Sequence, residues 1–522
     1  MTMHFSSRLM RGAALALLMP FAAAAQEAVF VLPSSETGAT VLDPIRATQA
    51  PTALTLIFDR LVEQGADQKF YPHLATEWAS SPDGMEWTFK LRDDVTFHDG
   101  EPFNADTVIW WIGQYAKTDN AYMTAAIERV EAIGPHEVRF VMKHPDPNLL
   151  YNLASRFMGI PSPKSYAALG EDFGVSAAVG SGPFEMQSFT PGVETVLHRF
   201  DGYTWGSPLS ENKGPAKIAD LKFVQIADTS AALLEMRTGG VDLAVDVPAS
   251  VLSQYKALPN VEVRTLPAFG IYYMPINVTV EPFTDVKVRE ATELAVRPQE
   301  IIDSLFAGVG KPLHTFLISS LPEAQVDPAL TVNSDPARAK ALLDEAGWIV
   351  GADGIRIKDG KPLEASLWVQ SDTEFRQMAE ILQAQLKDIG MKVDIQVLDP
   401  GAIRDAFRKG GHQLAVRRYN WNNADILDWF YTAEKLGFPN ISMLNDPKAE
   451  ELRKKAMTGS ATPEERSRNF IAYHEYILSL HTMAPLLEPD QQVVFNASRL
   501  SMPEKIDGPL FAAQTVLDIG VK

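Results

Sequence analysis

One stretch of the sequence combines residue types suited to gripping a small polar ligand. It runs from Arg417 to Trp429 and follows residues 412–416, a segment that we expect to be a strand, so it should lie at that strand's carboxyl end. Trp and Tyr offer rigid apolar surfaces with a polar edge, Asn offers hydrogen-bond donors and acceptors, and Asp can hold a cation. The predicted ligand-binding residues are Arg418, Tyr419, Trp421, Asn422, Asn423 and Asp425. In the alternative interpretation, Trp421 and Trp429 are core residues and the polar residues cap a helix.

Catalytic and metal-binding motifs are matched only in part. His474-Glu475 is followed by His481, seven residues after the first His, whereas a zinc-binding helix needs His at i and i+4. The segment 308–311 lacks the first Gly and the final Ser or Thr of a phosphate-binding loop, and 180–182 lacks the spacing of a nucleophile elbow. We therefore expect no catalytic residue, no metal site and no cofactor. So acidic a chain offers many carboxylate pairs, which leaves acid–base catalysis open.

Composition excludes several classes of protein. The chain has 522 residues, of which 46% are hydrophobic and 22% charged, the balance of a globular protein with several domain-sized units. Its net charge of −19 repels phosphate backbones, so we expect no binding to nucleic acid. The chain has no Cys, which excludes disulfides, thiolate metal sites and cysteine nucleophiles.

The N-terminal residues 1–25 are typical of a secretory signal peptide. Arg8 and Arg11 precede an apolar segment, 12–25, that is too short to span a bilayer and ends in small residues. An ordinary N-terminal helix is the alternative. No later stretch is long and apolar enough to cross a membrane, and without Cys there is no acceptor for a lipid thioether. We expect cleavage after Ala25 and free diffusion in a bacterial periplasm.

The elements that must position these residues alternate between strands and helices, which favours α/β layers. In the segment 85–91, apolar and polar residues alternate as in a half-buried strand, and 136–142 repeats the pattern. Further on, 363–369 and 391–398 are predicted strands joined by a helix over 374–389. This order predicts a right-handed parallel crossover, and such sheets place ligands at the carboxyl ends of their strands, often between two lobes.

Several ordered motifs carry a resemblance to a known family. They are Tyr71–Trp78, Ser81–Val95, Phe97–Val108, Gly180–Phe184, Arg237–Asp242, Asn277, Pro282–Ala291, Asp335–Leu343 and Trp421–Asp425. The chain resembles the extracellular solute-binding proteins of family 5, the periplasmic dipeptide-, oligopeptide- and nickel-binding components of ATP-binding-cassette (ABC) importers. The resemblance covers nearly the whole chain after residue 25.

The resemblance implies an α/β fold of two lobes, the periplasmic binding protein fold, with a hinge and an α+β insert in the first lobe. The implied segments are a signal peptide (1–25), a first lobe (26–67, 180–266 and 488–522), its insert subdomain (68–179) and a second lobe (267–487). The implied function is capture of a peptide or peptide-like solute between the lobes and its delivery to an inner-membrane ABC permease. We expect a monomer without enzymatic activity.

The sequence departs from the family pattern in one informative place. In peptide binders of this family an Asp-Pro pair follows the Trp, and its acid holds the ligand's α-amino group; here Asp425 matches the acid and Ile426 replaces the Pro. Arg404, Arg417 and Arg418 are candidates for holding a carboxylate. Alternative ligands are an opine, a glutathione-like compound or an oligosaccharide. Alternative functions are a periplasmic hydrolase and a binding module that serves a sensor or chaperone.

Overall fold

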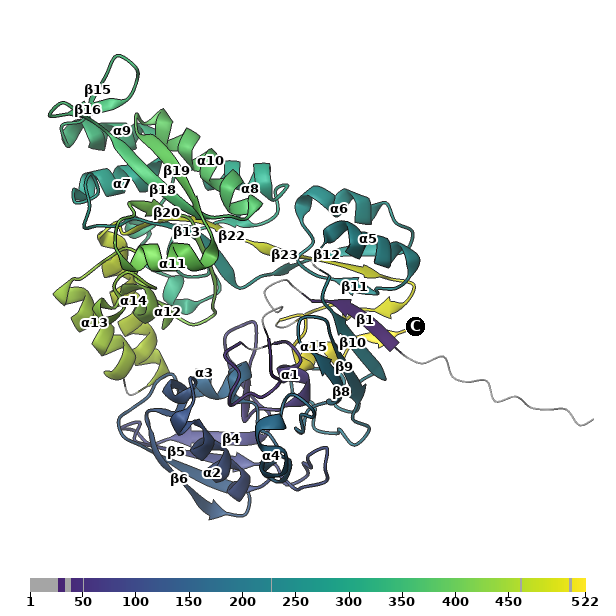
Figure 1. Ribbon diagram of the computed structural model, residues 1–522. Coiled ribbons are helices and arrows are strands. Elements are labelled where there is room, and N and C mark those ends of the chain that lie inside the picture. Colours follow the sequence, from purple (N-terminus) through teal and green to yellow (C-terminus); the bar gives the residue numbers. More distant parts are fainter. Residues whose placement is uncertain (1–26, 33–38, 50, 227, 461, 507–508) are drawn as a thin grey trace, which may run out of the picture.

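The computed structural model describes residues 27–32, 39–49, 51–226, 228–460, 462–506 and 509–522, so the predicted signal peptide lies outside the described residues. Figure 1 shows a mixed α/β molecule with the second lobe at upper left, the sheet of the first lobe at right and the insert below. Among the described helices, none is long and apolar enough to cross a membrane.

A seven-stranded mixed sheet forms the first lobe, in the order β12-β23-β11-β1-β10-β9-β8. Its strands are β1 (Glu27–Val31), β8 (Phe184–Thr190), β9 (Glu194–Arg199), β10 (Asp220–Val224), β11 (Leu243–Ala244), β12 (Val261–Pro267) and β23 (Asp490–Asn496). The helices α5 (Thr229–Thr238) and α6 (Ala249–Lys256) pack on one face through Leu233, Met236 and Tyr255. Short elements complete the lobe: α1 (Leu54–Ile57), β2 (Val62–Gln64), β24 (Leu500–Ser501), α15 (Ala513–Val516) and β25 (Gly520–Val521). β2 pairs with β3 (Phe70–Pro72), at the start of the predicted insert.

The insert is built on an antiparallel four-stranded sheet, β4-β5-β7-β6. Its elements are β4 (Ala75–Ser80), β5 (Glu86–Leu91), α2 (Ala105–Gln114), β6 (Ile127–Gly134), β7 (Glu137–Met142), α3 (Leu149–Ala154) and α4 (Pro163–Leu169). The strands predicted at 85–91 and 136–142 are confirmed. Phe89 and Phe140 belong to the same hydrophobic cluster as Phe30 and Phe223 of the seven-stranded sheet, so the insert shares its core with the first lobe.

Two sheets form the second lobe, β14-β22-β13-β21 and the parallel β19-β18-β20. Their strands are β13 (Gly270–Pro275), β14 (Lys311–Pro312), β18 (Glu364–Gln370), β19 (Lys392–Leu398), β20 (Leu414–Ala415), β21 (Arg417–Asn420) and β22 (Met483–Glu488). A small sheet adds β15 (Ile349–Val350), β16 (Arg356–Lys358) and β17 (Lys361–Pro362). The helices are α7 (Val286–Ala295), α8 (Pro298–Leu305), α9 (Pro336–Glu345), α10 (Thr373–Asp388), α11 (Pro400–Arg408), α12 (Ile426–Tyr431), α13 (Pro447–Thr458) and α14 (Pro463–Ser479).

The predicted parallel crossover is confirmed as β18–α10–β19. Phe375, Met378, Leu382 and Leu386 of α10 are buried against the sheet, at the spacing of one helix face. The helix ends where Gly390 takes a positive φ of 87°, a conformation that glycine adopts without strain.

The prediction for residues 412–420 was wrong in one respect. The strand predicted over 412–416 is only the short β20, and the polar-aromatic stretch that follows it begins as a further strand, β21, which pairs antiparallel with β13. Gly270 of β13 makes this pairing possible, because a Cβ there would lie 2.2 Å from Asn420 Oδ1 and 2.7 Å from the Tyr419 carbonyl oxygen. The polar-aromatic stretch therefore begins inside a sheet.

The segment Gly180-Ser181-Gly182 is a close crossing of two backbones. A Cβ on Gly180 would lie 2.0 Å from the Ile57 carbonyl oxygen, and one on Gly182 would lie 2.3 Å from that of Leu56. The Ser181 hydroxyl donates to Asp59 Oδ2 at 3.0 Å, and His98 Nε2 donates to the Gly182 carbonyl at 2.9 Å. These residues join the insert to the first lobe.

We expect Gly180→Ala to destabilise the protein by about 1–3 kcal/mol or more, because a backbone oxygen must move to admit the methyl group. Gly113→Ala is the matched control. Gly113 lies exposed within α2 with nothing close to its would-be Cβ, so this change should stabilise the helix by up to about 1 kcal/mol. Urea denaturation followed by circular dichroism measures both, and equal midpoints for the two variants would contradict the prediction.

Candidate functional site

The predicted ligand-binding stretch meets the insert and the first lobe at its C-terminal half. Residues 421–425 connect β21 to α12, with Asp425 at the N-cap position of that helix. Burial, and then the negative charge of Asp425, raise the pKa of Tyr122 in the insert. The same charge contributes to the raised pKa of Tyr151, on α3. Asp425 of the second lobe therefore lies close to two tyrosines of the insert.

The Asp425 carboxylate is held in place by a short local network. Trp421 Nε1 donates to its Oδ1 at 2.7 Å, and the Asp425 backbone N–H donates to Asn423 Oδ1 at 3.3 Å. Burial raises the pKa of Asp425 to about 6, and the charges of Asp428 and Asp146 raise it as well, against the lowering effects of Trp421 and Arg466. A carboxylate that burial and like charges make costly to ionise is suited to receiving a cation.

Arg466, on α14, ties the second lobe to the insert beneath this site. Its side chain is only 2% exposed. Nε donates to Asn148 Oδ1 in the insert at 2.9 Å, Nη1 lies 3.4 Å from Glu323 Oε1, and Nη2 donates to Asn423 Oδ1. The guanidinium also lies over the rings of Tyr151 and Phe470, at 4.8 and 4.4 Å from their centroids. One arginine thus links the insert to the loop that carries Asp425.

Two further contacts join the lobes around Asp425. Asn422 is exposed, and its Nδ2 donates to Gln64 Oε1 of β2 at 3.2 Å. The rings of Trp429 and Tyr122 meet edge to face at 6.4 Å, and Lys435 Nζ lies 3.7 Å from the centroid of the Trp429 ring. The site therefore has aromatic and amide groups from both sides.

The structure brings Trp421, Asn422, Asn423 and Asp425 together and places the other two predicted residues elsewhere. Arg418 Nη1 donates to the Tyr272 hydroxyl at 3.1 Å, and its guanidinium lies over that ring. Tyr419 packs in the core of the second lobe, and its hydroxyl donates to the Phe316 carbonyl. A direct ligand contact for Arg418 or Tyr419 stays a prediction.

Sequence reasoning missed the partners that come from distant segments: Gln64, Tyr122, Asp146, Tyr151 and Arg466. No local signal marks them, because each belongs to an ordinary strand, turn or helix sequence. Sequence reasoning also could not choose among the three arginines named as candidates for holding a carboxylate. The structure separates them: in the part of the chain that it describes, buried Arg417 Nη1 and the Tyr273 hydroxyl on the paired strand have no hydrogen-bond partner.

The partial zinc motif is structural, as the spacing indicated. His474 is fully buried; its Nδ1 donates to the Glu323 carbonyl at 3.0 Å and its Nε2 accepts the Phe316 N–H at 3.2 Å. His481 instead pairs with Glu293 at 2.7 Å. Both rings of the motif are thus engaged separately in holding the second lobe.

We expect Trp421→Phe to raise the pKa of Asp425 above its value of about 6 by about one pH unit. The Trp421 hydrogen bond stabilises the ionised carboxylate in the wild type, and the substitution removes it. Trp429→Phe is the matched control, since the Trp429 ring contacts Tyr122 and Lys435. A carboxyl ¹³C NMR titration reads the value directly. An unchanged midpoint in Trp421→Phe would show that this hydrogen bond does not control the carboxylate.

Comparisons with known proteins identify the family. The profile of the bacterial extracellular solute-binding proteins, family 5 Middle, matches residues 69–436. The nickel-binding periplasmic protein of Escherichia coli (strain K12) is 30% identical over 382 residues, which cover 70% of this chain and 70% of the relative. Di/tripeptide-binding protein 1 of Pseudomonas aeruginosa (strain UCBPP-PA14) is 26% identical, with 81% and 80% covered.

Solved structures agree with the two-lobe α/β fold. NikA from Brucella suis, in complex with Fe(III)-EDTA, superposes with a TM-score of 0.81 at 23% identity, over 95% of this chain and 100% of that one. At this identity the likeness establishes the fold alone. Together with the profile match and the 30% identical relative, these findings show that the chain belongs to the bacterial extracellular solute-binding proteins of family 5.

Proposed function

We propose that the chain captures a peptide or peptide-like solute with a free amino group and holds its ammonium on Asp425. The observation that carries the proposal is the Asp425 carboxylate itself, which lies between the lobes near two tyrosines. It remains short of positive charge, because Arg466 does not offset burial and the like charges of Asp428 and Asp146, which raise its pKa. An ammonium would supply that charge, and aromatic rings nearby would add cation–π attraction. The di/tripeptide-binding relative supports the same class of solute.

The carboxylate of such a solute would bind Arg417. Its buried Nη1 and the neighbouring Tyr273 hydroxyl, both without a partner among the described residues, are donors that a carboxylate would satisfy. An unpaired buried donor is costly, so its pairing by the solute would contribute to affinity. Arg404 contributes positive charge close to Arg417.

As a family member, the chain binds a small solute and works with an ABC permease, and its relatives are periplasmic binding proteins rather than enzymes. We further propose that it acts as a monomer after removal of residues 1–25, without a lipid anchor, without binding nucleic acid, and that it releases its solute unaltered. Mass spectrometry of the released solute tests the last point against the hydrolase alternative.

We propose the division of the chain that the resemblance implies, with a hinge where the chain crosses between lobes. Two adjacent crossings support it. Between 267 and 270 the chain leaves β12 of the first sheet for β13 of the second, and between 488 and 490 it returns from β22 to β23. Rotation about these two short, adjacent connections would open and close the site.

A thermal-shift screen with matched ligand pairs tests the proposed function. Dipeptides and tripeptides should raise the melting temperature, whereas their N-acetylated forms, which lack the ammonium, should not. Glutathione, opines and oligosaccharides form the comparison set. Stabilisation by oligosaccharides alone, or equally by free and N-acetylated peptides, would contradict the proposal.

A further inference from the structure

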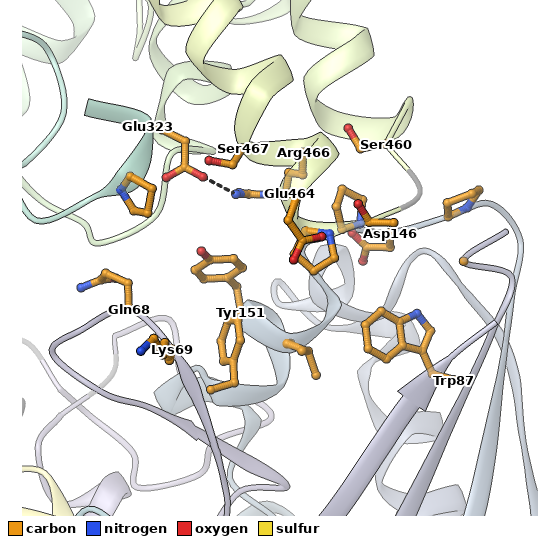
Figure 2. Close-up of a pocket in the computed structure, with 18 of the residues that line it drawn as sticks. Gln68, Lys69, Trp87, Asp146, Tyr151, Glu323, Ser460, Glu464, Arg466 and Ser467 are labelled. Atoms are coloured by element: carbon orange, nitrogen blue, oxygen red, sulfur yellow. Dashed lines mark hydrogen bonds and ion pairs between the residues drawn. The ribbon is translucent and has the colours of Figure 1, made fainter. Parts of the chain in front are cut away.

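A cavity lies between the insert and the second lobe, and its wall includes Arg466. Its volume is about 460 Å³, within the usual range for small-molecule sites. Figure 2 shows Glu323, Ser467 and Arg466 along its upper wall and Gln68, Lys69, Tyr151 and Trp87 along its lower wall. Neither Asp425 nor Trp421 is among the lining residues.

Two deeply buried side chains that line this cavity carry polar atoms without a partner. Trp87 is 8% exposed and Glu323 is 2% exposed. Within the described residues, neither Trp87 Nε1 nor Glu323 Oε2 has a hydrogen-bond partner. A buried polar group without a hydrogen-bond partner costs about 1–3 kcal/mol of stability, and more when it is charged. A ligand that pairs with each of these two atoms would remove that cost. The indole requires an acceptor and the carboxylate requires a donor.

The charge and the walls of the cavity define the chemistry further. Arg466 is already engaged with Asn148, Asn423 and Glu323 Oε1, so Glu323 Oε2 is left without a hydrogen-bond partner among the described residues. The Asp146 carboxylate, which accepts the Asn148 N–H at 2.9 Å, adds a second negative charge to the lining, whereas the lining residue Lys69 lies 3.6 Å from Asp67. Burial raises the pKa of Asp146 even though the Asn148 N–H and the positive charges of His144 and Arg466 lower it. Apolar and aromatic walls complete the cavity: Phe70, Trp78, Trp87, Leu150 and Tyr151.

We propose that this cavity is a second binding site, separate from Asp425, for a small aromatic primary amine that also carries a hydrogen-bond acceptor. The ammonium donates to Glu323 Oε2 and faces Asp146, the aromatic body lies among the rings of the insert, and the acceptor meets Trp87 Nε1. Arg466 and Tyr151 line this cavity, whereas Asp425 does not.

Calorimetric titration with tyramine tests the site, because tyramine has an ammonium, one ring and a phenolic acceptor. Glu323→Gln and Trp87→Phe should each weaken tyramine binding about tenfold or more, the effect of one lost hydrogen bond to a charged or buried group. Phenethylamine lacks the phenolic oxygen, so its affinity should be the same for wild type and Trp87→Phe. 4-Hydroxyphenylacetate, a carboxylate in place of the amine, should not bind.

Control variants distinguish tyramine binding in this cavity from binding at Asp425 and from a loss of folding. Asp425→Asn should leave tyramine affinity unchanged, and so should Trp110→Phe, whose indole lies on α2 against Tyr166. If Glu323→Gln fails to fold, Asp146→Asn tests the same charge and leaves the Glu323–Arg466 pair intact. The proposal is overturned if wild type does not bind tyramine, if Asp425→Asn abolishes binding, or if the cavity variants bind as wild type does.

Discussion

Asp425→Asn is expected to weaken the binding of the tightest amine-bearing peptide by about 100-fold or more at pH 7.5. Loss of one partner from a desolvated charge pair costs about 2–5 kcal/mol, and about 2.7 kcal/mol corresponds to 100-fold. The asparagine keeps the shape of the carboxyl group and can still accept from Trp421 Nε1. Only the charge that the ammonium needs is removed.

The same substitution should leave the ligand-free protein at least as stable at pH 7.5. Burial raises the pKa of Asp425 to about 6, so the folded chain binds this proton more tightly than the unfolded chain, and ionisation above that pH costs stability. Glu434→Gln, an exposed carboxylate just beyond α12, is the matched control and should change neither affinity nor stability. Calorimetric titration that finds the affinity of Asp425→Asn equal to that of wild type would remove Asp425 from the site.

Arg466→Met is expected to lower the free energy of unfolding by about 3–5 kcal/mol, the usual cost of breaking a buried ion pair from one side. The substitution keeps an apolar stem between Tyr151 and Phe470 but leaves the Glu323 carboxylate buried without its cation. It also removes the donors to Asn148 and Asn423, so the insert loses its link to the Asp425 loop. Affinity for the peptide should fall as well.

Two further variants test whether the unpaired Glu323 charge causes the loss of stability in Arg466→Met. Arg468→Met changes an exposed arginine of the same helix and should have little effect. Adding Glu323→Gln to Arg466→Met should recover part of the lost stability, because the uncompensated charge is then gone. Denaturation curves in which Arg466→Met matches Arg468→Met, or in which the double variant is the least stable, would contradict this role for Arg466.

The periodicity of apolar residues predicted those helices and strands whose conformation follows from their own sequence. The crossover β18–α10–β19 follows from one apolar helix face and a terminal glycine, and the hairpin strands of the insert follow from alternation. Strand β21 could not be predicted in this way, because Arg-Arg-Tyr-Asn has no apolar alternation. Its conformation is set by pairing with β13, where Gly270 admits the close approach.

In the candidate site, too, a local sequence pattern could indicate some residues, whereas others come from distant segments that only the fold brings together. Trp421 and Asp425 are four residues apart and bond to each other, so a local pattern could indicate them. Arg466, Tyr122 and Tyr151 reach the site only through the folding of the insert against the second lobe. Arg417 was one of three equal candidates until the structure showed which guanidinium nitrogen is buried without a partner among the described residues.

The most direct test of the account is the number of protons released when a peptide binds at pH 6. Asp425, with a pKa of about 6, is then about half protonated, and an ammonium needs it ionised, so binding should release about half a proton. The peptide's own amino group is already charged at this pH. Calorimetry in buffers of different ionisation enthalpy should show this release in wild type and none in Asp425→Asn. Binding without proton release at pH 6, or with equal release in both proteins, would contradict the central claim that Asp425 holds the solute's ammonium.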